Sequence, residues 1–194
     1  MTAPDPLAAA LFLIVGLVLA GLLHSAWLRS AASRRFAVPL DGGRHVRGRR
    51  LLGDNKTLRG LMVMVPGTGL SFALLAALLG ATSAAPLAPW PMTPWRYGLL
   101  GVWAGLGFML GELPNSFVKR QLDVPPGRAP RAGPAAALSF VVDRLDSIVG
   151  MLAAVSLVVP TPWRTWAWVV VLGPGIHWAF SVLLFRLGVK ERAA

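Results

Sequence analysis

Five long apolar runs, separated by polar segments, dominate the hydrophobicity pattern of this chain. In order, they cover residues 7–28, 61–79, 97–113, 139–159 and 166–187. A helix needs about 20 residues to cross the hydrocarbon core of a bilayer, and each run approaches or exceeds that length. The pattern predicts an all-α, polytopic integral membrane protein with about five transmembrane helices, forming a single domain over residues 1–194.

Composition supports the membrane interpretation and limits the chemistry. The chain is 55% hydrophobic and only 14% charged, whereas soluble domains are about 25% charged. It has no cysteine, which excludes a disulfide framework and a thiolate metal site. Its net charge of +11 lies in a few loops between apolar runs, so anionic membrane lipids or a polyphosphate substrate explain it better than nucleic acid does. Monomer and homodimer both remain open.

The distribution of Lys and Arg predicts the orientation. Seventeen of the 19 lie in segments 29–60 and 114–144 and in the tail from Arg186, whereas Arg96 and Arg164 alone lie in the other two connections. Lys and Arg accumulate on the cytoplasmic side of membrane proteins. We therefore expect the amino terminus outside, the carboxyl terminus in the cytoplasm, and cytoplasmic loops at about 29–60 and 114–138. The arginines of the first loop are interpreted as topology determinants that contact anionic lipid: Arg29, Arg34, Arg35, Arg44, Arg47, Arg49 and Arg50.

The acidic segment at the start of the fourth predicted span, residues 139–159, is the strongest candidate for chemistry. Residues 148–159 are too few to span a bilayer alone, so the helix must begin within the acidic segment that contains Asp143 and Asp146. Charged groups at membrane depth are costly and usually functional. The two carboxylates are three positions apart and project from one helical face. A hard divalent cation such as Mg²⁺ would relieve the repulsion between them.

The predicted topology brings more polar residues to the same depth. The third run ends on the cytoplasmic side at Glu112, which should therefore meet Asp143 and Asp146. The polar residues that follow share one face of a continuing helix, bent at Pro114; they are Asn115, Ser116 and Lys119.

Basic residues flank these carboxylates. Lys56 and Arg59 precede the second run, and Arg120 follows Lys119. Carboxylates hold metal ions, whereas Lys and Arg hold phosphates. Two residues have alternative interpretations, because Asp54 suits either nucleotide binding or a helix N-cap, and Arg144 suits either phosphate binding or neutralisation of a neighbouring carboxylate. The chain has neither a P-loop nor a dinucleotide-binding fingerprint.

Three motifs then resemble a known family. The segments Ser116-Phe-Val-Lys-Arg120 and Asp143-Arg-Leu-Asp-Ser147 resemble the signature of the phosphatidate cytidylyltransferase superfamily. Gly53-Asp-Asn-Lys-Thr-Leu-Arg-Gly60 is similar to the Gly-Asp-Gly-Lys-Thr-Trp-Arg-Gly motif of its CDP-archaeol synthase branch, and Val38-Pro-Leu-Asp-Gly-Gly43 resembles the loop before that motif. The resemblance covers roughly residues 25–150. The chain departs from the family pattern at Asn55, Leu58 and Glu112, which replace Gly, Trp and Asp.

The resemblance implies a Mg²⁺-dependent membrane enzyme, in the cytoplasmic membrane with its site facing the cytoplasm. From CTP and phosphatidic acid, or the ether-linked analogue, it would make a CDP-lipid and pyrophosphate. The implied catalytic group is Asp143, Asp146, Glu112 and Lys119, of which the three carboxylates would bind the metal. The implied substrate-binding residues are Asp54, Lys56, Arg59, Asn115, Ser116, Arg120 and Arg144.

Other functions fit the sequence less well. A CDP-alcohol phosphotransferase would also use Mg²⁺ and carboxylates, but its Asp-Gly-x-x-Ala-Arg pattern is missing. A transporter would place charges near the bilayer midplane and show an internal repeat, and neither feature is present. The Pro- and Gly-rich stretch at 125–134 is compatible with either a lid over CTP or a linker.

Overall fold

The computed structural model of the protein describes residues 2–125 and 134–188. These residues form five α-helices: α1 (Pro6–Arg29), α2 (Leu58–Gly80), α3 (Pro94–Gln121), α4 (Pro134–Ser156) and α5 (Trp163–Arg186). The short elements are the 3-10 helices η1 (Ala32–Phe36) and η2 (Ala85–Leu87) and the paired antiparallel strands β1 (His45–Val46) and β2 (Arg49–Arg50). The helical fold class predicted from the apolar runs is confirmed.

Three of the described helices, α1, α2 and α5, are long and apolar enough to cross a membrane. The other two carry the polar residues of the motifs along part of their length, and five spans therefore remain a prediction. Helix α3 continues through Pro114 to Gln121, beyond the end of its apolar run. The polar residues after Glu112 thus lie on the same helix as the apolar residues before it.

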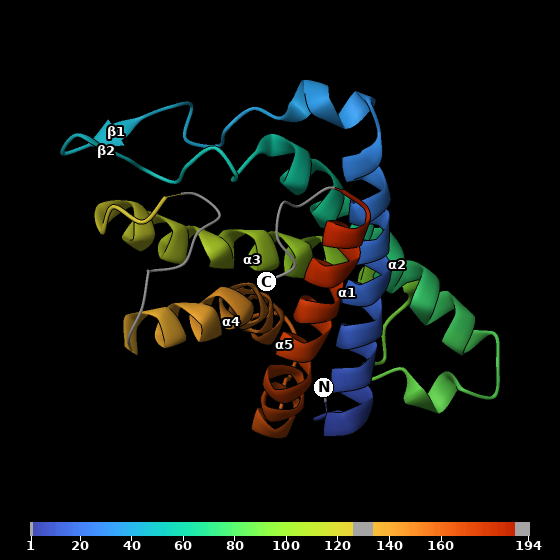
Figure 1. The fold of residues 1–194 in the computed structure, drawn as a ribbon. Coiled ribbons are helices and arrows are strands. Elements are labelled where there is room, and N and C mark those ends of the chain that lie inside the picture. The colour runs from blue at the N-terminus through green and yellow to red at the C-terminus, as the bar shows by residue number, and fades with distance from the viewer. Residues whose placement is uncertain (1, 126–133, 189–194) are drawn as a thin grey trace.

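Helix α3 is central to the packing. It contacts α2 and α4, while α1 packs against α2 and α5, and α5 also contacts α4. Figure 1 shows α3 and α4 side by side, running across the direction of α1 and α5. The carboxyl-terminal half of α3 therefore reaches both α4 and the polar loop before α2.

Aromatic side chains close one end of the bundle. Phe12 packs against Phe72 and Tyr97, with ring centroids 5.2 and 4.8 Å apart. The Tyr97 hydroxyl donates to the carbonyl of Trp90, and the Trp90 indole donates to the carbonyl of Pro160 at 3.0 Å. The α2–α3 and α4–α5 connections thus meet at this end. The α1–α2 loop meets the carboxyl end of α3 elsewhere, through Arg49 and Asp123.

Glycines set the distance between α3 and α4. A β-carbon on Gly150 would overlap the carbonyl oxygen of Gly107 and lie 2.7 Å from Cα of Gly111. A β-carbon on Gly111 would in turn overlap the carbonyl oxygen of Asp146. The two backbones are therefore in contact at these glycines, directly beside the polar motif of α4.

We expect Gly150→Ala to destabilise the protein and to reduce its activity. The added methyl group meets backbone atoms that cannot rotate away, and overpacking of this kind costs about 1–3 kcal/mol. Gly80→Ala is the matched control, because nothing lies within 4 Å of a β-carbon at that helical position. Thermal unfolding in detergent measures both variants. Equal melting temperatures would contradict the close α3–α4 contact.

Candidate active site

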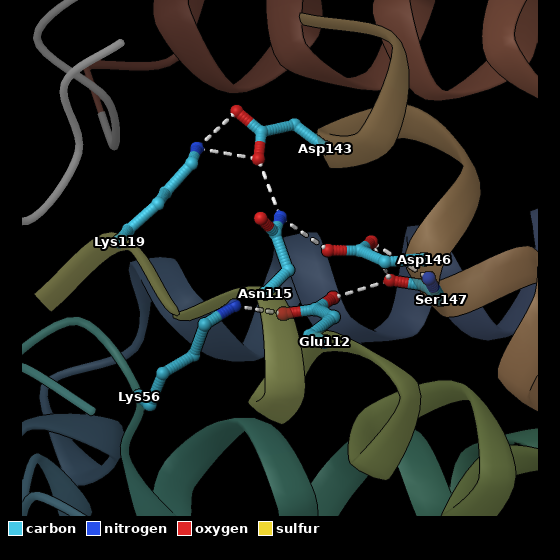
Figure 2. A network of polar contacts seen from close by, with 7 residues as sticks. All are labelled: Lys56, Glu112, Asn115, Lys119, Asp143, Asp146 and Ser147. Atoms are coloured by element: carbon cyan, nitrogen blue, oxygen red, sulfur yellow. Dashed lines mark hydrogen bonds and ion pairs between the residues drawn. The ribbon is translucent and has the colours of Figure 1, made fainter. Parts of the chain in front are cut away.

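Asn115 on α3 links the two carboxylates of α4. Its Nδ2 donates to Asp143 Oδ1 at 2.6 Å and to Asp146 Oδ2 at 2.8 Å. Figure 2 shows both carboxylates directed from α4 toward this amide. The predicted common face of Asp143 and Asp146 therefore exists and is turned toward α3.

Two lysines bring positive charge to the same place. Lys119 Nζ contacts both oxygens of Asp143, and Lys56 Nζ pairs with Glu112 Oε2. The two lysine side chains are only 14% and 17% exposed, so these ion pairs are poorly screened by solvent. The loop before α2, the carboxyl-terminal half of α3 and the middle of α4 thus supply one polar network (Figure 2).

Ser147 completes the network and was not among the sequence candidates. Its hydroxyl donates to Glu112 Oε1 at 2.7 Å and lies 3.3 Å from Asp146 Oδ1, while its backbone amide donates to Asp146 Oδ1 at 2.7 Å. Ser147 therefore joins the third carboxylate to the other two. The available signal was its position four residues after Asp143, one helical turn along the same face.

Asp41 organises the loop that carries Lys56, and sequence reasoning missed it as well. Its side chain is fully buried and accepts hydrogen bonds from Arg50 and from the backbone amides of Gly43, Leu52 and Gly53. Burial alone would raise the pKa of Asp41. The hydrogen bonds from Arg50 and the three amides outweigh it and hold the pKa well below its usual range. The signal lay in the segment 38–43, whose resemblance to the family loop does not by itself indicate a role for Asp41.

Backbone pairing between the segment around Asp41 and the segment around Lys56 fixes the position of Lys56. Residues 38–40 pair with 56–58 through an isolated bridge between Pro39 and Thr57, with Leu40 N donating to Lys56 O at 2.8 Å. The loop is thereby folded back on itself at the base of α2. Lys56 leaves this paired segment and reaches Glu112.

Several other candidates lie outside the network. Asp54 is 72% exposed and pairs with Arg50 at 2.9 Å, and the N-cap of α2 is Thr57, so the N-cap interpretation of Asp54 is wrong. Arg59 contributes its carbonyl oxygen, which accepts a hydrogen bond from the Trp27 indole at 3.1 Å. The Arg144 guanidinium lies 3.3 Å from the centre of the Phe140 ring on its own helix.

Two of the seven loop arginines have partners within the protein, in addition to their predicted role as topology determinants. Arg50 pairs with Asp41 and Asp54, and Arg49 pairs with Asp123 at 2.5 Å and with the carbonyl of Gln121. The reason is that the loop folds onto the end of α3, which places carboxylates beside these arginines. The predicted lid or linker at 125–134 lies almost entirely outside the described residues.

We expect Asp41→Asn to lower the free energy of unfolding by about 3 kcal/mol at neutral pH, because it removes the buried charge that accepts hydrogen bonds from Arg50 and three backbone amides. The folded-state pKa of Asp41 lies below its unfolded value of about 3.9, so this stabilisation is present above that pH and is lost as the pH falls. Asp54→Asn removes an exposed partner of the same arginine and should cost less than about 1 kcal/mol. Melting temperatures of both variants between neutral pH and pH about 3 test this; equal losses at neutral pH would contradict the role of Asp41.

The carboxylates suit a hard divalent cation. Among the described residues, no three His, Asp or Glu side chains are gathered tightly enough to enclose a metal as they stand. However, the oxygens Asp143 Oδ1 and Asp146 Oδ2 both lie within 2.8 Å of one atom, Nδ2 of Asn115. Small side-chain rotations would let one cation replace that donor. Carboxylate oxygens are the ligands that Mg²⁺ prefers. Glu112 is close to this pair, because the Ser147 hydroxyl contacts both Glu112 and Asp146.

Comparison with known proteins identifies the family. The family model described as CarS-like, CDP-archaeol synthase, matches residues 10–193. The chain belongs to the CDP-archaeol synthase family. It is 36% identical over 167 residues to the CDP-archaeol synthase of Halobacterium salinarum, covering 79% of this chain and 81% of that relative. It is 32% identical over 179 residues to the CDP-archaeol synthase of Methanosphaerula palustris, covering 86% and 96%.

A solved structure supports the same assignment. An intramembrane enzyme for archaeal membrane lipid biosynthesis superposes with a TM-score of 0.55 at 25% sequence identity, covering 91% of this chain and 93% of that one. The membrane-embedded fold and the family resemblance found in the sequence are thereby confirmed. In this chain, the network around Asn115 gathers the charged groups that chemistry on charged substrates requires.

Proposed function

We propose that this protein is a Mg²⁺-dependent CTP:lipid-phosphate cytidylyltransferase that makes a CDP-activated glycerolipid and pyrophosphate. The observation that carries the proposal is the network in which Asp143, Asp146 and Glu112 are joined to Lys56 and Lys119. It combines three anionic groups for a metal with two cations for phosphates, in a chain whose other helices are apolar. The CDP-archaeol synthase relatives support the same reaction class.

The reaction joins two anions. A phosphate oxygen of the lipid attacks the α-phosphorus of CTP, a new P–O–P linkage forms, and the bond to the β-phosphate breaks. Pyrophosphate leaves with the bonding electron pair. The substrate phosphate is itself the nucleophile, so the protein needs only to position the reactants and neutralise their charge.

The network supplies those two functions. Bound Mg²⁺, held by Asp143 and Asp146 with Glu112 beside them, would supply charge stabilisation at the transferring phosphate. Lys119 and Lys56, which pair with Asp143 and Glu112 in this structure, would turn their ammonium groups to phosphate oxygens when the carboxylates bind metal. Before the metal binds, Asn115 keeps Asp143 and Asp146 together, and Ser147 joins Asp146 to Glu112.

Arg120 is a further candidate for phosphate binding. The residue is 7% exposed, and its Nε and Nη1 have no hydrogen-bond partner among the described residues. A buried guanidinium without partners is energetically costly. A phosphate oxygen would satisfy both donors. Ser116, buried one turn earlier, remains a candidate in the same role.

We also propose that the chain crosses the membrane five times, with its amino terminus outside and its active site facing the cytoplasm. The clustering of the α2–α3 and α4–α5 connections supports it, and a cytoplasmic site would give access to CTP. The exposed arginines Arg29, Arg34, Arg35, Arg44 and Arg47 would contact anionic lipid. The contacts that join the three carboxylates to Lys56 and Lys119 all come from described residues of one chain.

The absence of cysteine makes this topology directly testable. We expect Thr82→Cys to react with a membrane-impermeant maleimide in intact cells, and Arg44→Cys to react only after lysis. Both positions are exposed, so an unlabelled site reports the side of the membrane and not burial. Labelling of Arg44→Cys in intact cells would contradict the proposed orientation.

Activity is tested with purified protein in liposomes, labelled CTP and either phosphatidic acid or digeranylgeranylglyceryl phosphate, with and without Mg²⁺. We expect labelled lipid only when the metal is present, and none from Asp143→Asn. The ratio of the two rates gives the preference between acyl and ether lipids. A folded protein that labels neither lipid would refute the proposal.

A further inference from the structure

An apolar groove begins at the active-site network and follows α4. It has a volume of about 370 Å³ and is formed by α4 residues between Val142 and Ala153, together with Gly111 of α3. Its α4 members are spaced three, four, seven, eight and eleven positions after Val142, so they form one stripe along the helix. We call it the α4 groove.

Two glycines, which have no side chain, form the floor of the groove. Gly111 and Gly150 line it at the point where the backbones of α3 and α4 touch. No side chain can project there without moving a helix. Leu145 and Val149 flank these glycines, and Val149 is 43% exposed. The groove is therefore accessible from the apolar surroundings of α4.

One polar residue connects the groove to the network. Asp146 lines the groove, and its Oδ2 accepts the hydrogen bond from Asn115 at 2.8 Å. Figure 2 shows this carboxylate pointing from α4 toward the centre of the network. A second groove of about 350 Å³, between Leu19 of α1 and Leu74 of α2, is lined by no charged residue and so offers nothing to a charged head group.

We propose that the α4 groove binds the hydrocarbon chain of the lipid phosphate, over the segment nearest its head group. The inference rests on the proposed function, because it requires the head group at the network. An amphiphile whose phosphate reaches Lys119 and the carboxylates must lead its chain away over apolar surface. The α4 groove is an apolar surface that starts at Asp146, and burying methylene groups there stabilises the bound lipid.

Substitution in the groove tests this by chain length. Val149→Phe fills the groove, and Val141→Phe makes the same change on α4 at a position that is 49% exposed and outside the groove. We expect Val149→Phe to raise KM for a long-chain phosphatidic acid about tenfold, the equivalent of two buried methylenes. KM for diacetyl phosphatidic acid, whose two-carbon chains end before the groove, and for CTP should stay unchanged, as should every constant of Val141→Phe. Equal effects on both lipids, or none, would overturn the proposal.

Photocrosslinking tests the same site without turnover. A phosphatidic acid with a diazirine in the chain segment near the glycerol is bound to the wild-type protein, and the adducts are mapped by mass spectrometry. We expect adducts within residues 142–153 that unlabelled phosphatidic acid displaces and diacylglycerol does not. Adducts concentrated between α1 and α2, or equal labelling by a phosphatidylcholine probe, would overturn the proposal. Displaceable adducts in a protein that makes no CDP-lipid would refute the enzymatic proposal and leave the chain site intact.

Discussion

Asp146→Asn is expected to reduce CDP-lipid formation at least about 10³-fold. The substitution keeps the shape of the side chain and an acceptor for Asn115, but removes a charge from the centre of the proposed metal site. The metal in such reactions supplies several kcal/mol of charge stabilisation, and about 4 kcal/mol corresponds to three orders of magnitude in rate. The initial rate of lipid labelling at saturating CTP and Mg²⁺ measures the effect.

Two controls separate catalysis from folding in this experiment. The melting temperature of Asp146→Asn should not fall, because replacing a buried carboxylate by a neutral amide removes a desolvation cost. Asp123→Asn changes the same residue type at a 67% exposed position that pairs with Arg49, and should retain the wild-type rate. If Asp146→Asn retained more than about a tenth of the rate, the metal role of Asp146 would be wrong.

Lys119→Met should reduce kcat about 10²- to 10³-fold. Methionine preserves the length and apolar stem of the side chain and removes the ammonium group that contacts both oxygens of Asp143. Loss of one group that stabilises charge in a transition state typically costs about 2.7–4 kcal/mol. Because the charge is needed most as pyrophosphate departs, kcat should fall more than KM for CTP rises.

Arg96→Met is the matched control for this substitution. It removes a cation from the same helix at the opposite end of α3, where the side chain is exposed. We expect kcat and both KM values to match those of the wild type. A loss in Lys119→Met that appeared only in KM would indicate that the lysine binds CTP in the ground state and does not stabilise the transition state.

Local helical geometry explains why much of the network could be predicted from sequence. The three-residue spacing of Asp143 and Asp146 fixes a common face in any α-helix, and the same periodicity connects Glu112 with Asn115 and Lys119. Reversal of the chain between α3 and α4 then brings the two faces together. The same geometry explains why Arg144 lies outside the network. It follows Asp143 by one residue, so its side chain is rotated by about 100° around the helix and packs on Phe140.

Loop structure explains what the sequence could not reveal. The contacts of Asp41 depend on a chain path with positive φ at Gly42, Gly43, Gly48 and Gly53, and no hydrophobic period records such a path. The ion pairs of Arg49 with Asp123 and of Arg50 with Asp41 could not be predicted either, because only the folded loop brings these residues together. The end of α3 was also not predictable from hydrophobicity. The apolar run ends at residue 113, but the helix continues through Pro114 to Gln121 with polar side chains.

Cytidylyl transfer is identified by which phosphorus atom of CTP enters the lipid. Purified protein in liposomes is given phosphatidic acid, Mg²⁺ and CTP labelled at either the α- or the γ-phosphorus, and the lipid and aqueous phases are counted separately. A cytidylyltransferase puts the α-label into the lipid and the γ-label into pyrophosphate, and chelation of the metal abolishes both products. Lipid that carries the γ-label, or unlabelled lipid from a folded protein, would show that the protein does not transfer a cytidylyl group.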